Sequence, residues 1–102
     1  MRRRDAIVAM ALFLTGCSLG GPADDATGED IYAQLCARCH GVDLDGGVGP
    51  ALGPDSAAAS EDDEYIEFTI SNGRGRMPSF ESLQSDQLDR LVDYIREVQA
   101  DE

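Results

Sequence analysis

The stretch "LCARCHG", residues 35–41, holds two of the three cysteines of this 102-residue chain and its only histidine. Cys36 and Cys39 stand three positions apart, and His40 follows directly. On a helical turn this spacing places both thiols on one side of the backbone, with the imidazole beside them. Thiolate and imidazole groups are the side chains that bind transition metals such as iron and zinc. We therefore expect the chemistry of the chain to be located at this turn.

The pentad Cys36–His40 has the pattern C-x-x-C-H, which is the attachment signature of c-type haem. Two thiols at this spacing can add to the two vinyl groups on one edge of a porphyrin and form thioethers. The histidine that follows then binds the iron as its proximal ligand. The motif predicts one covalently attached haem c, held by Cys36 and Cys39, with His40 on the iron.

Other interpretations of the pentad fit less well. A thioredoxin-like C-x-x-C belongs in a βαβ pattern, which the sequence lacks. A structural zinc site needs four ligands, whereas Cys36, Cys39 and His40 supply three. A disulfide between Cys36 and Cys39 is the third alternative, and the sequence alone leaves it open.

The second axial ligand of a haem is predicted by elimination to be Met77. The other two methionines lie at the N-terminus, in a segment with the features of a secretory signal, and the chain has no second histidine and no lysine. Met77 stands in "NGRGRMPSF", a glycine-rich polar loop that ends in proline. A lone methionine usually fills a core, but a polar loop is a poor place for that role.

The N-terminus has the layout of a secretory signal. Three arginines at 2–4 precede the apolar run "AIVAMALFLTG", residues 6–16, as a positive n-region precedes an h-region. The run is shorter than the ~20 residues that span a bilayer. "LTGC", residues 14–17, resembles a bacterial lipobox. We therefore predict a signal peptide at 1–16 and a lipidated Cys17, with ordinary secretion and a free Cys17 thiol as the alternative.

The charge of the remaining chain is strongly negative. The signal carries a net charge of +2 from three arginines and Asp5, so the −12 of the whole chain leaves −14 on residues 17–102. Nucleic acid is excluded as a partner, because such binding needs cations on phosphates. Anionic lipid headgroups should also repel this surface. Acyl chains on Cys17 would therefore hold the protein at a membrane, and two chains suffice for stable anchoring.

The rest of the chain is predicted to be a tether and an all-α domain. Residues 17–26 are rich in Gly, Pro and Asp without apolar periodicity, which indicates a flexible tether. The domain then covers residues 27–102. Between its first two helices, "GVDLDGGVGPALGP" is too rich in glycine and proline for regular structure, so long loops must pack around the helices.

Three main helices are predicted. The first follows Thr27 as N-cap. The second follows Ser60, which forms a capping-box-like pair with Asp63, and ends at Asn72-Gly73. The third follows Ser85 and is amphipathic. Its apolar positions recur at helical spacing: Leu88, Leu91, Val92, Ile95 and Val98.

From Thr27 onward the chain resembles a class I cytochrome c of the small bacterial monohaem kind. Gly28 and Tyr32 stand eight and four residues before Cys36, as the glycine and aromatic of that family's first helix do. Tyr94 matches the aromatic of its C-terminal helix, which crosses the first helix at the glycine. The resemblance implies three main helices and loops wrapped around one covalent haem.

The same resemblance extends to the loops. "GPAL", residues 49–52, is similar to the family's haem-flanking loop, which implies that the Pro50 carbonyl orients His40 and that Leu52 packs on the haem. "RMPSF" matches the loop of the methionine ligand, which supports Met77. Arg74 or Arg76 could pair with a haem propionate, and a solvated arginine is an equal alternative at each position.

The resemblance implies an electron carrier, with no catalysis and no small-molecule substrate. Together with the lipobox, it predicts a lipid-anchored cytochrome on the outer face of the cytoplasmic membrane. The cytochrome would carry single electrons between membrane-associated respiratory partners that have basic or neutral docking faces. Two alternatives stay open: a sensor or peroxidase-like protein in which Met77 leaves the iron, and an electron-relay subunit of a larger dehydrogenase or oxidase.

Overall fold

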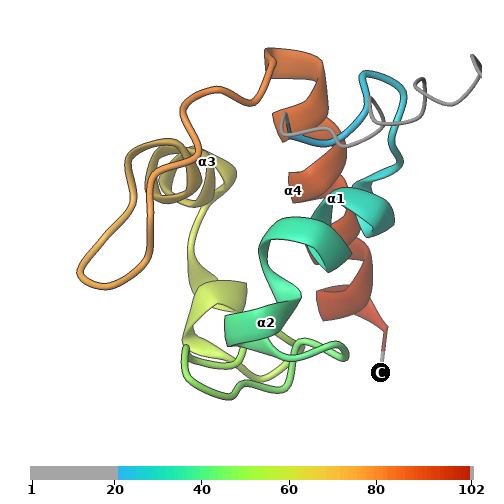
Figure 1. Cartoon of the computed structure of the whole chain (residues 1–102). Coiled ribbons are helices and arrows are strands. Elements are labelled where there is room, and N and C mark those ends of the chain that lie inside the picture. The colour runs from blue at the N-terminus through green and yellow to red at the C-terminus, as the bar shows by residue number, and fades with distance from the viewer. Residues whose placement is uncertain (1–20, 102) are drawn as a thin grey trace, which may run out of the picture.

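The structure is a computed structural model that describes residues 21–101. The predicted signal peptide and Cys17 lie outside this range. The elements in chain order are helix α1 (Gly28–Leu35), the short helix α2 (Ala37–His40), the 3₁₀ helix η2 (Ala57–Ser60), α3 (Asp63–Asn72) and α4 (Ser85–Ala100) (Figure 1). Within residues 21–101 the only bridge between extended segments is an isolated one, Arg74 with Met77. The predicted all-α class with three main helices is confirmed.

The helix starts agree with the sequence at α1 and differ at α3. Thr27 Oγ1 accepts a hydrogen bond from the Asp30 amide at 3.0 Å, so the predicted N-cap is correct. The predicted cap at Ser60 is wrong, because that residue ends η2 and Asp62 caps α3. The Asp62 carboxylate accepts from the Tyr65 amide at 2.8 Å. Several residues of "SEDDE" can cap a helix, and the 3₁₀ turn that precedes them removes Ser60 from the choice.

Helix α4 includes Ser85 as its first residue, one position before the predicted start, and its cap is therefore different. Gln84 is the N-cap, and Gln84 and Gln87 form a reciprocal capping box. The Gln84 amide donates to the Gln87 Oε1 atom at 2.8 Å. The predicted apolar stripe of α4 faces inward, with Leu91, Val92 and Ile95 buried.

The crossing of α1 and α4 is the centre of the fold. A Cβ on Gly28 would lie 2.1 Å from the Arg90 carbonyl oxygen and 2.8 Å from the Tyr94 Cβ atom. No side chain larger than hydrogen fits between the helices there. One turn further along α1, the rings of Tyr32 and Tyr94 pack with centroids 5.6 Å apart. The crossing at this glycine agrees with the expectation from the cytochrome resemblance.

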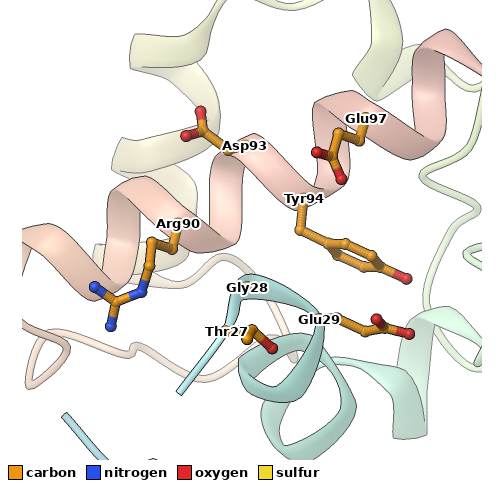
Figure 2. Close-up of a pocket in the computed structure, with 7 residues that line it drawn as sticks. All are labelled: Thr27, Gly28, Glu29, Arg90, Asp93, Tyr94 and Glu97. Atoms are coloured by element: carbon orange, nitrogen blue, oxygen red, sulfur yellow. The ribbon is translucent and has the colours of Figure 1, made fainter. Parts of the chain in front are cut away.

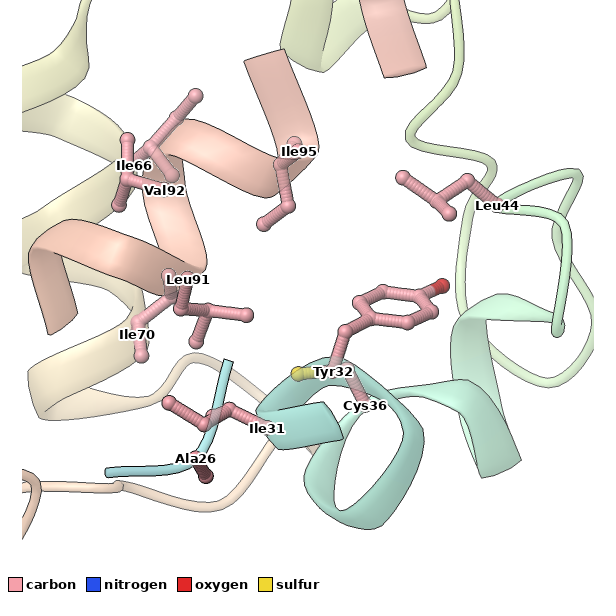
Figure 3. Packing of buried hydrophobic residues seen from close by; sticks show 10 residues of the cluster. All are labelled: Ala26, Ile31, Tyr32, Cys36, Leu44, Ile66, Ile70, Leu91, Val92 and Ile95. Carbon is pink, nitrogen blue, oxygen red and sulfur yellow. The ribbon is translucent and has the colours of Figure 1, made fainter. Parts of the chain in front are cut away.

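A single apolar cluster fills the space between the helices (Figure 3). Helix α1 contributes Ile31 and Tyr32, α3 contributes Ile66 and Ile70, and α4 contributes its buried stripe. Two members come from the motif region rather than from the three main helices, namely Cys36 and Leu44. The scaffold and the CxxCH region therefore share one core.

The last turns of α4 hold the loops in place. Arg96 Nε donates to Asp63 Oδ1 at 2.8 Å, which fixes the start of α3. Arg96 also donates to Gln99 Oε1 at 2.7 Å. Gln99 Nε2 in turn donates to the Leu52 carbonyl at 2.9 Å. The loop that follows α2 is thus tied to the C-terminal end of α4. Within residues 21–101, no helix has the length and apolar character needed to cross a membrane.

Candidate haem-binding site

The CxxCH motif forms a tight turn at the end of α1. Cys36 is both the C-cap of α1 and the N-cap of α2. Its amide donates to the Tyr32 carbonyl at 2.8 Å, and its carbonyl accepts from the His40 amide at 2.9 Å. Cys36 is 7% exposed, whereas Cys39 is partly exposed, and both thiols are free. The chain therefore presents both thiols on the helical turn that the motif predicts.

The imidazole of His40 is held by the loop that follows. Its Nδ1 atom lies 2.7 Å from the Pro50 carbonyl oxygen. Because a carbonyl only accepts, Nδ1 must carry the hydrogen, and the lone pair remains on Nε2, where a metal can bind. A partner of this kind fixes the tautomer and the ring orientation of a ligand histidine. His40 and Pro50, which the cytochrome resemblance pairs as iron ligand and orienting carbonyl, are thus in hydrogen-bond contact.

Gly49 allows the loop to pass close to the imidazole. A Cβ at this position would lie 3.1 Å from His40 Cε1 and 3.2 Å from His40 Nδ1, tighter than ordinary van der Waals contact. The backbone is held there by the Gly49 amide, which donates to the Cys39 carbonyl at 2.7 Å. The Gly46 amide donates to the His40 carbonyl at 2.8 Å. Backbone hydrogen bonds rather than regular structure therefore shape this side of the site.

Tyr32 has a second role that the sequence did not predict. Its hydroxyl donates to the Gly41 carbonyl at 2.7 Å, at the residue that ends α2 with a φ of 93°. Tyr32 is 2% exposed, and burial, with the Cys36 thiol as a secondary cause, raises its pKa above the ordinary value. The hydrogen bond connects α1 to the end of the CxxCH turn. The sequence gives one indication of this bond: position 32 is a tyrosine, although a phenylalanine would pack in the core equally well.

Leu44 is a further residue that the sequence did not predict. It is the only non-glycine residue with positive φ, 61°, among residues 21–101, and its side chain is 1% exposed. This conformation is costly for leucine. It turns the side chain into the apolar cluster while the backbone continues around His40. The Leu44 carbonyl accepts from the Leu52 amide at 2.9 Å, which closes the loop.

Met77 lies in a tight loop after α3. The amides of Arg74 and Met77 each donate to the other's carbonyl, at 3.1 and 2.9 Å. The Met77 side chain is partly buried against the same apolar cluster that contains Cys36, and Leu52 packs against that cluster too. Arg74 donates to the Tyr65 hydroxyl, whereas Arg76 is exposed. The structure thus brings Met77 and Leu52 to the core that the CxxCH turn also enters.

The residues at this turn fit a covalent haem better than the alternatives. Within residues 21–101 no cluster of three or more His, Cys, Asp or Glu side chains could hold a metal ion. Burial raises the pKa of the Cys36 thiol to about 12, with the nearby Cys39 as a secondary cause. Free thiols, an oriented imidazole and apolar side chains suit a porphyrin.

A groove of about 360 Å³ lies elsewhere, on the outer side of the α1–α4 crossing (Figure 2). Its lining includes the carboxylates of Glu29, Asp93 and Glu97 around the ring of Tyr94. Burial, followed by the charges of Glu29, Asp43 and Glu97, raises the pKa of Tyr94. The groove has no sulfur and no imidazole among its lining residues, so it is separate from the CxxCH site.

The fold and the CxxCH turn together define a c-type cytochrome, and comparisons with known proteins agree. Residues 23–95 match the family model described as "Cytochrome C oxidase, cbb3-type, subunit III". The chain is 34% identical to cytochrome c-551 of Bacillus subtilis over 82 residues, 69% of this chain and 71% of that protein. It is 36% identical to cytochrome c55X of Pseudomonas aeruginosa over 99 residues, 82% of each chain. A solved structure, the c-type cytochrome NirC, superposes with a TM-score of 0.60 at 36% identity, covering 69% of this chain and 85% of that one.

The chain therefore belongs to the class I monohaem c-type cytochromes, of the kind that includes cytochromes c-551, c55X and c6. Membership implies one covalent haem c and redox proteins as partners. Small cytochromes of this family are electron carriers and not enzymes. Bacterial members are extracytoplasmic. The expected cytochrome fold and electron-carrier function are confirmed at this level.

Proposed function

We propose that Cys36 and Cys39 hold the haem by thioether bonds and that His40 and Met77 are its axial ligands. When bound, the haem supplies a one-electron iron couple. The protein would then carry single electrons between membrane-associated respiratory partners on the outer side of the cytoplasmic membrane. With His40 and Met77 both committed to the iron, no position would remain for a substrate.

The observation that carries this proposal is the 2.7 Å contact between His40 Nδ1 and the Pro50 carbonyl. It leaves Nε2 as the metal-binding nitrogen and fixes the plane of the ring. A core histidine could make such a bond for structural reasons alone. Here the ring follows two free thiols at haem-attachment spacing, and Gly49 is kept small beside it.

The visible spectrum tests the ligand set. We expect a low-spin c-type spectrum in both oxidation states that does not change when carbon monoxide is added, because Met77 occupies the second axial position. Met77→Ala should open this position and allow rapid carbon monoxide binding. Phe80→Leu is the matched control, since Phe80 packs on the same cluster from the same loop without a ligand atom. Rapid binding by the unmodified protein would favour the sensor or peroxidase-like alternative.

We also propose that acyl chains on Cys17 anchor the protein. The support is the lipobox-like "LTGC" after a basic and apolar leader. Cys17→Ser should move the haem protein from the membrane fraction to the soluble extracytoplasmic fraction. Ser18→Ala is the control and should leave the protein in the membrane. A membrane-bound Cys17→Ser variant would contradict this part of the proposal.

The proposed docking partners have basic or neutral faces. Residues 17–102 carry a net charge of −14 and no lysine. Complementary charge raises association rates, and salt screens the effect. Electron exchange with a basic redox protein should therefore slow as ionic strength rises. A rate that does not change with salt would count against electrostatic docking.

A second candidate is an electron-relay subunit of a larger complex, because the matched family model is described as a subunit of an oxidase. The two candidates differ in the size of the native particle. Membranes solubilised in a mild detergent should yield a small haem-staining band for a separate carrier. A haem band that migrates with a large complex, and that disappears when the complex is disrupted, would favour the subunit.

A further inference from the structure

The first described residues lie against α4 and are not a free linker. Residues 22–26, here called the strap, make five hydrogen bonds to three side chains of that helix and its cap. Arg90 Nη2 donates to the Asp24 carbonyl at 2.7 Å, and Arg90 Nε donates to the Ala26 carbonyl at 3.0 Å. Gln84 Nε2 donates to the Asp24 carboxylate at 3.3 Å. All donors come from the first turns of α4.

Gln87 shows that the strap belongs to the folded domain. It is the only buried polar residue of those described, at 4% exposure. Its Nε2 donates to the carbonyls of Pro22 and Ala23 at 3.3 and 3.2 Å, while its Oε1 accepts from the Gln84 amide. A buried amide is costly unless both ends are hydrogen-bonded. Without the strap, the Nε2 end of Gln87 would lose both of these partners.

The strap also enters the core. Ala26 is buried in the apolar cluster beside α1, and its amide donates to the Ala23 carbonyl at 3.0 Å. The segment predicted as a tether was residues 17–26. Residues 22–26 are held on α4, so only residues 18–21 separate Cys17 from the strap. The five residue steps from Cys17 to Pro22 reach at most about 17 Å when fully extended.

The strap and the CxxCH region lie toward opposite ends of α4. The strap contacts positions 84–90, whereas Gln99 holds the Leu52 carbonyl of the loop after α2. At 1.5 Å per residue, Gln87 and Gln99 are about 18 Å apart along the helix axis. Figure 1 shows the strap beside the start of α4, and α2 near the end where α4 terminates.

We propose that the strap orients the domain on the membrane, with the start of α4 toward the lipid and the CxxCH end away from it. This inference rests on the proposed acylation of Cys17. A short tether at one end of a domain of this size restricts how far the other end can rotate toward the bilayer. The net charge of −14 belongs to residues 17–102 as a whole and disfavours close contact of the protein surface with anionic headgroups. The haem would then face redox partners that approach from the aqueous side.

Energy transfer from the membrane to the haem tests the orientation. Acylated full-length holo-protein is added to preformed phosphatidylcholine vesicles that carry a fluorescent donor on the lipid headgroup. The haem quenches the donor more strongly the closer it comes. Gln87→Ala/Arg90→Ala should release the strap, extend the free chain to residues 17–26 and shorten the mean donor lifetime. Arg96→Ala is the control, because Arg96 lies on the same helix and contacts none of the strap.

A second variant covers the case in which the double substitution fails to fold. Five Gly/Ser residues inserted between Gly20 and Gly21 lengthen the free chain and leave the strap contacts intact. This insertion should shorten the donor lifetime when equal amounts of haem protein are bound to the vesicles. The backbone amides of the strap should stay as protected from hydrogen exchange as in the unmodified protein. In the release variant, by contrast, the Ala26 amide should exchange its hydrogen faster.

The outcomes separate the two proposals. Mass spectrometry of the N-terminal peptide first shows whether Cys17 is acylated. A peptide without acyl mass overturns the anchor and, with it, the orientation. Acylated proteins whose donor lifetimes are equal with and without the insertion overturn the orientation and leave the anchor standing. A shorter lifetime with the longer tether, and no change in Arg96→Ala, supports the proposal.

Discussion

The two sides of this small domain are held together in different ways. On one side, α1 and α4 cross at Gly28 with buried apolar side chains on both helices. On the other side, the CxxCH turn and the loop to residue 56 contain the four-residue helix α2, and the 3₁₀ helix η2 follows them. We call this part of the domain the loop side. Loop shape there depends on backbone hydrogen bonds and on a leucine with positive φ.

The difference shows that the two sides have different tasks: one packs the core, and the other positions a side chain that can bind haem iron. The helix crossing buries its own apolar residues and needs no other group at the point of contact. The loop side orients His40 but buries few side chains of its own, as the high exposure of Val42 and Val48 shows. A haem would supply the apolar surface that this side lacks. The domain is small enough for such a contribution to decide whether it folds.

The largest expected effect is loss of the fold when haem cannot attach. Cys36→Ser/Cys39→Ser should remove most of the native helical signal in far-UV circular dichroism, because a group bound only by the folded state stabilises that state. Cys17→Ser, which leaves the haem attached, is the control. Native helix content without haem would show that the α1–α4 side folds alone, and the contrast between the two sides would become sharper.

Gly28→Ala tests the packed side directly. The added Cβ would meet Arg90 backbone at 2.1 Å, so the helices must separate. We expect the holo-protein to lose about 3 kcal/mol of unfolding free energy, measured by chemical denaturation. Gly21→Ala is the control, since nothing lies within 4 Å of a Cβ at that position. Equal stability of the two variants would contradict a close helix crossing.

Tyr32→Phe probes the bond that connects the two sides. Loss of the hydroxyl leaves the Gly41 carbonyl without this donor, and about 1 kcal/mol of stability should be lost at neutral pH. Tyr65→Phe, at an exposed tyrosine, should change stability by less than about 0.5 kcal/mol. Thermal unfolding monitored at the haem band provides the measurement for both.

The same tyrosine predicts a dependence on pH. Because burial raises the pKa of Tyr32 in the folded state, folding favours the neutral phenol. Its contribution is complete below the ordinary tyrosine pKa of about 10 and is lost as pH rises toward the higher folded value. Unfolding free energy should fall less steeply above pH 10 in Tyr32→Phe than in the unmodified protein. Identical slopes would show that Tyr32 does not titrate differently on folding.

The smallest expected effect is that of Arg96→Ala. Arg96 pairs with Asp63 at 2.8 Å, but the carboxylate is mostly exposed. Its removal should cost about 0.5 kcal/mol, and the difference should shrink in high salt because exposed ion pairs are screened. A double-mutant cycle with Asp63→Ala measures the pair itself. A coupling above 2 kcal/mol would make α4 a stronger support for the loop side than the helix crossing suggests.

The sequence was informative where a short pattern determines the structure. The stripe on α4, the Thr27 cap and the Gly28 crossing follow from periodicity, capping chemistry and the family resemblance. The residue pair His40 and Pro50 was indicated only by resemblance, because the nine residues between them leave their geometry free. The positive φ of Leu44 depends on tertiary packing that no local pattern encodes.

The main features that the sequence did not predict are contacts between segments far apart in the chain. Gln87 and Arg90 read as ordinary polar positions on an amphipathic helix, and residues 22–26 read as a linker by composition. Their hydrogen bonds join residues more than 60 positions apart. No periodicity connects such residues, so only the folded structure could reveal them.

The burial of Cys36 has a consequence for the order of events in biogenesis. In the folded chain Cys36 is 7% exposed and belongs to the same apolar cluster as buried residues of α1, α3 and α4. A thiol in that position cannot be reached by a porphyrin once α4 has closed over α1. Because the domain is expected to fold only with haem bound, attachment should take place on the unfolded chain, and the core around Cys36 should close afterwards.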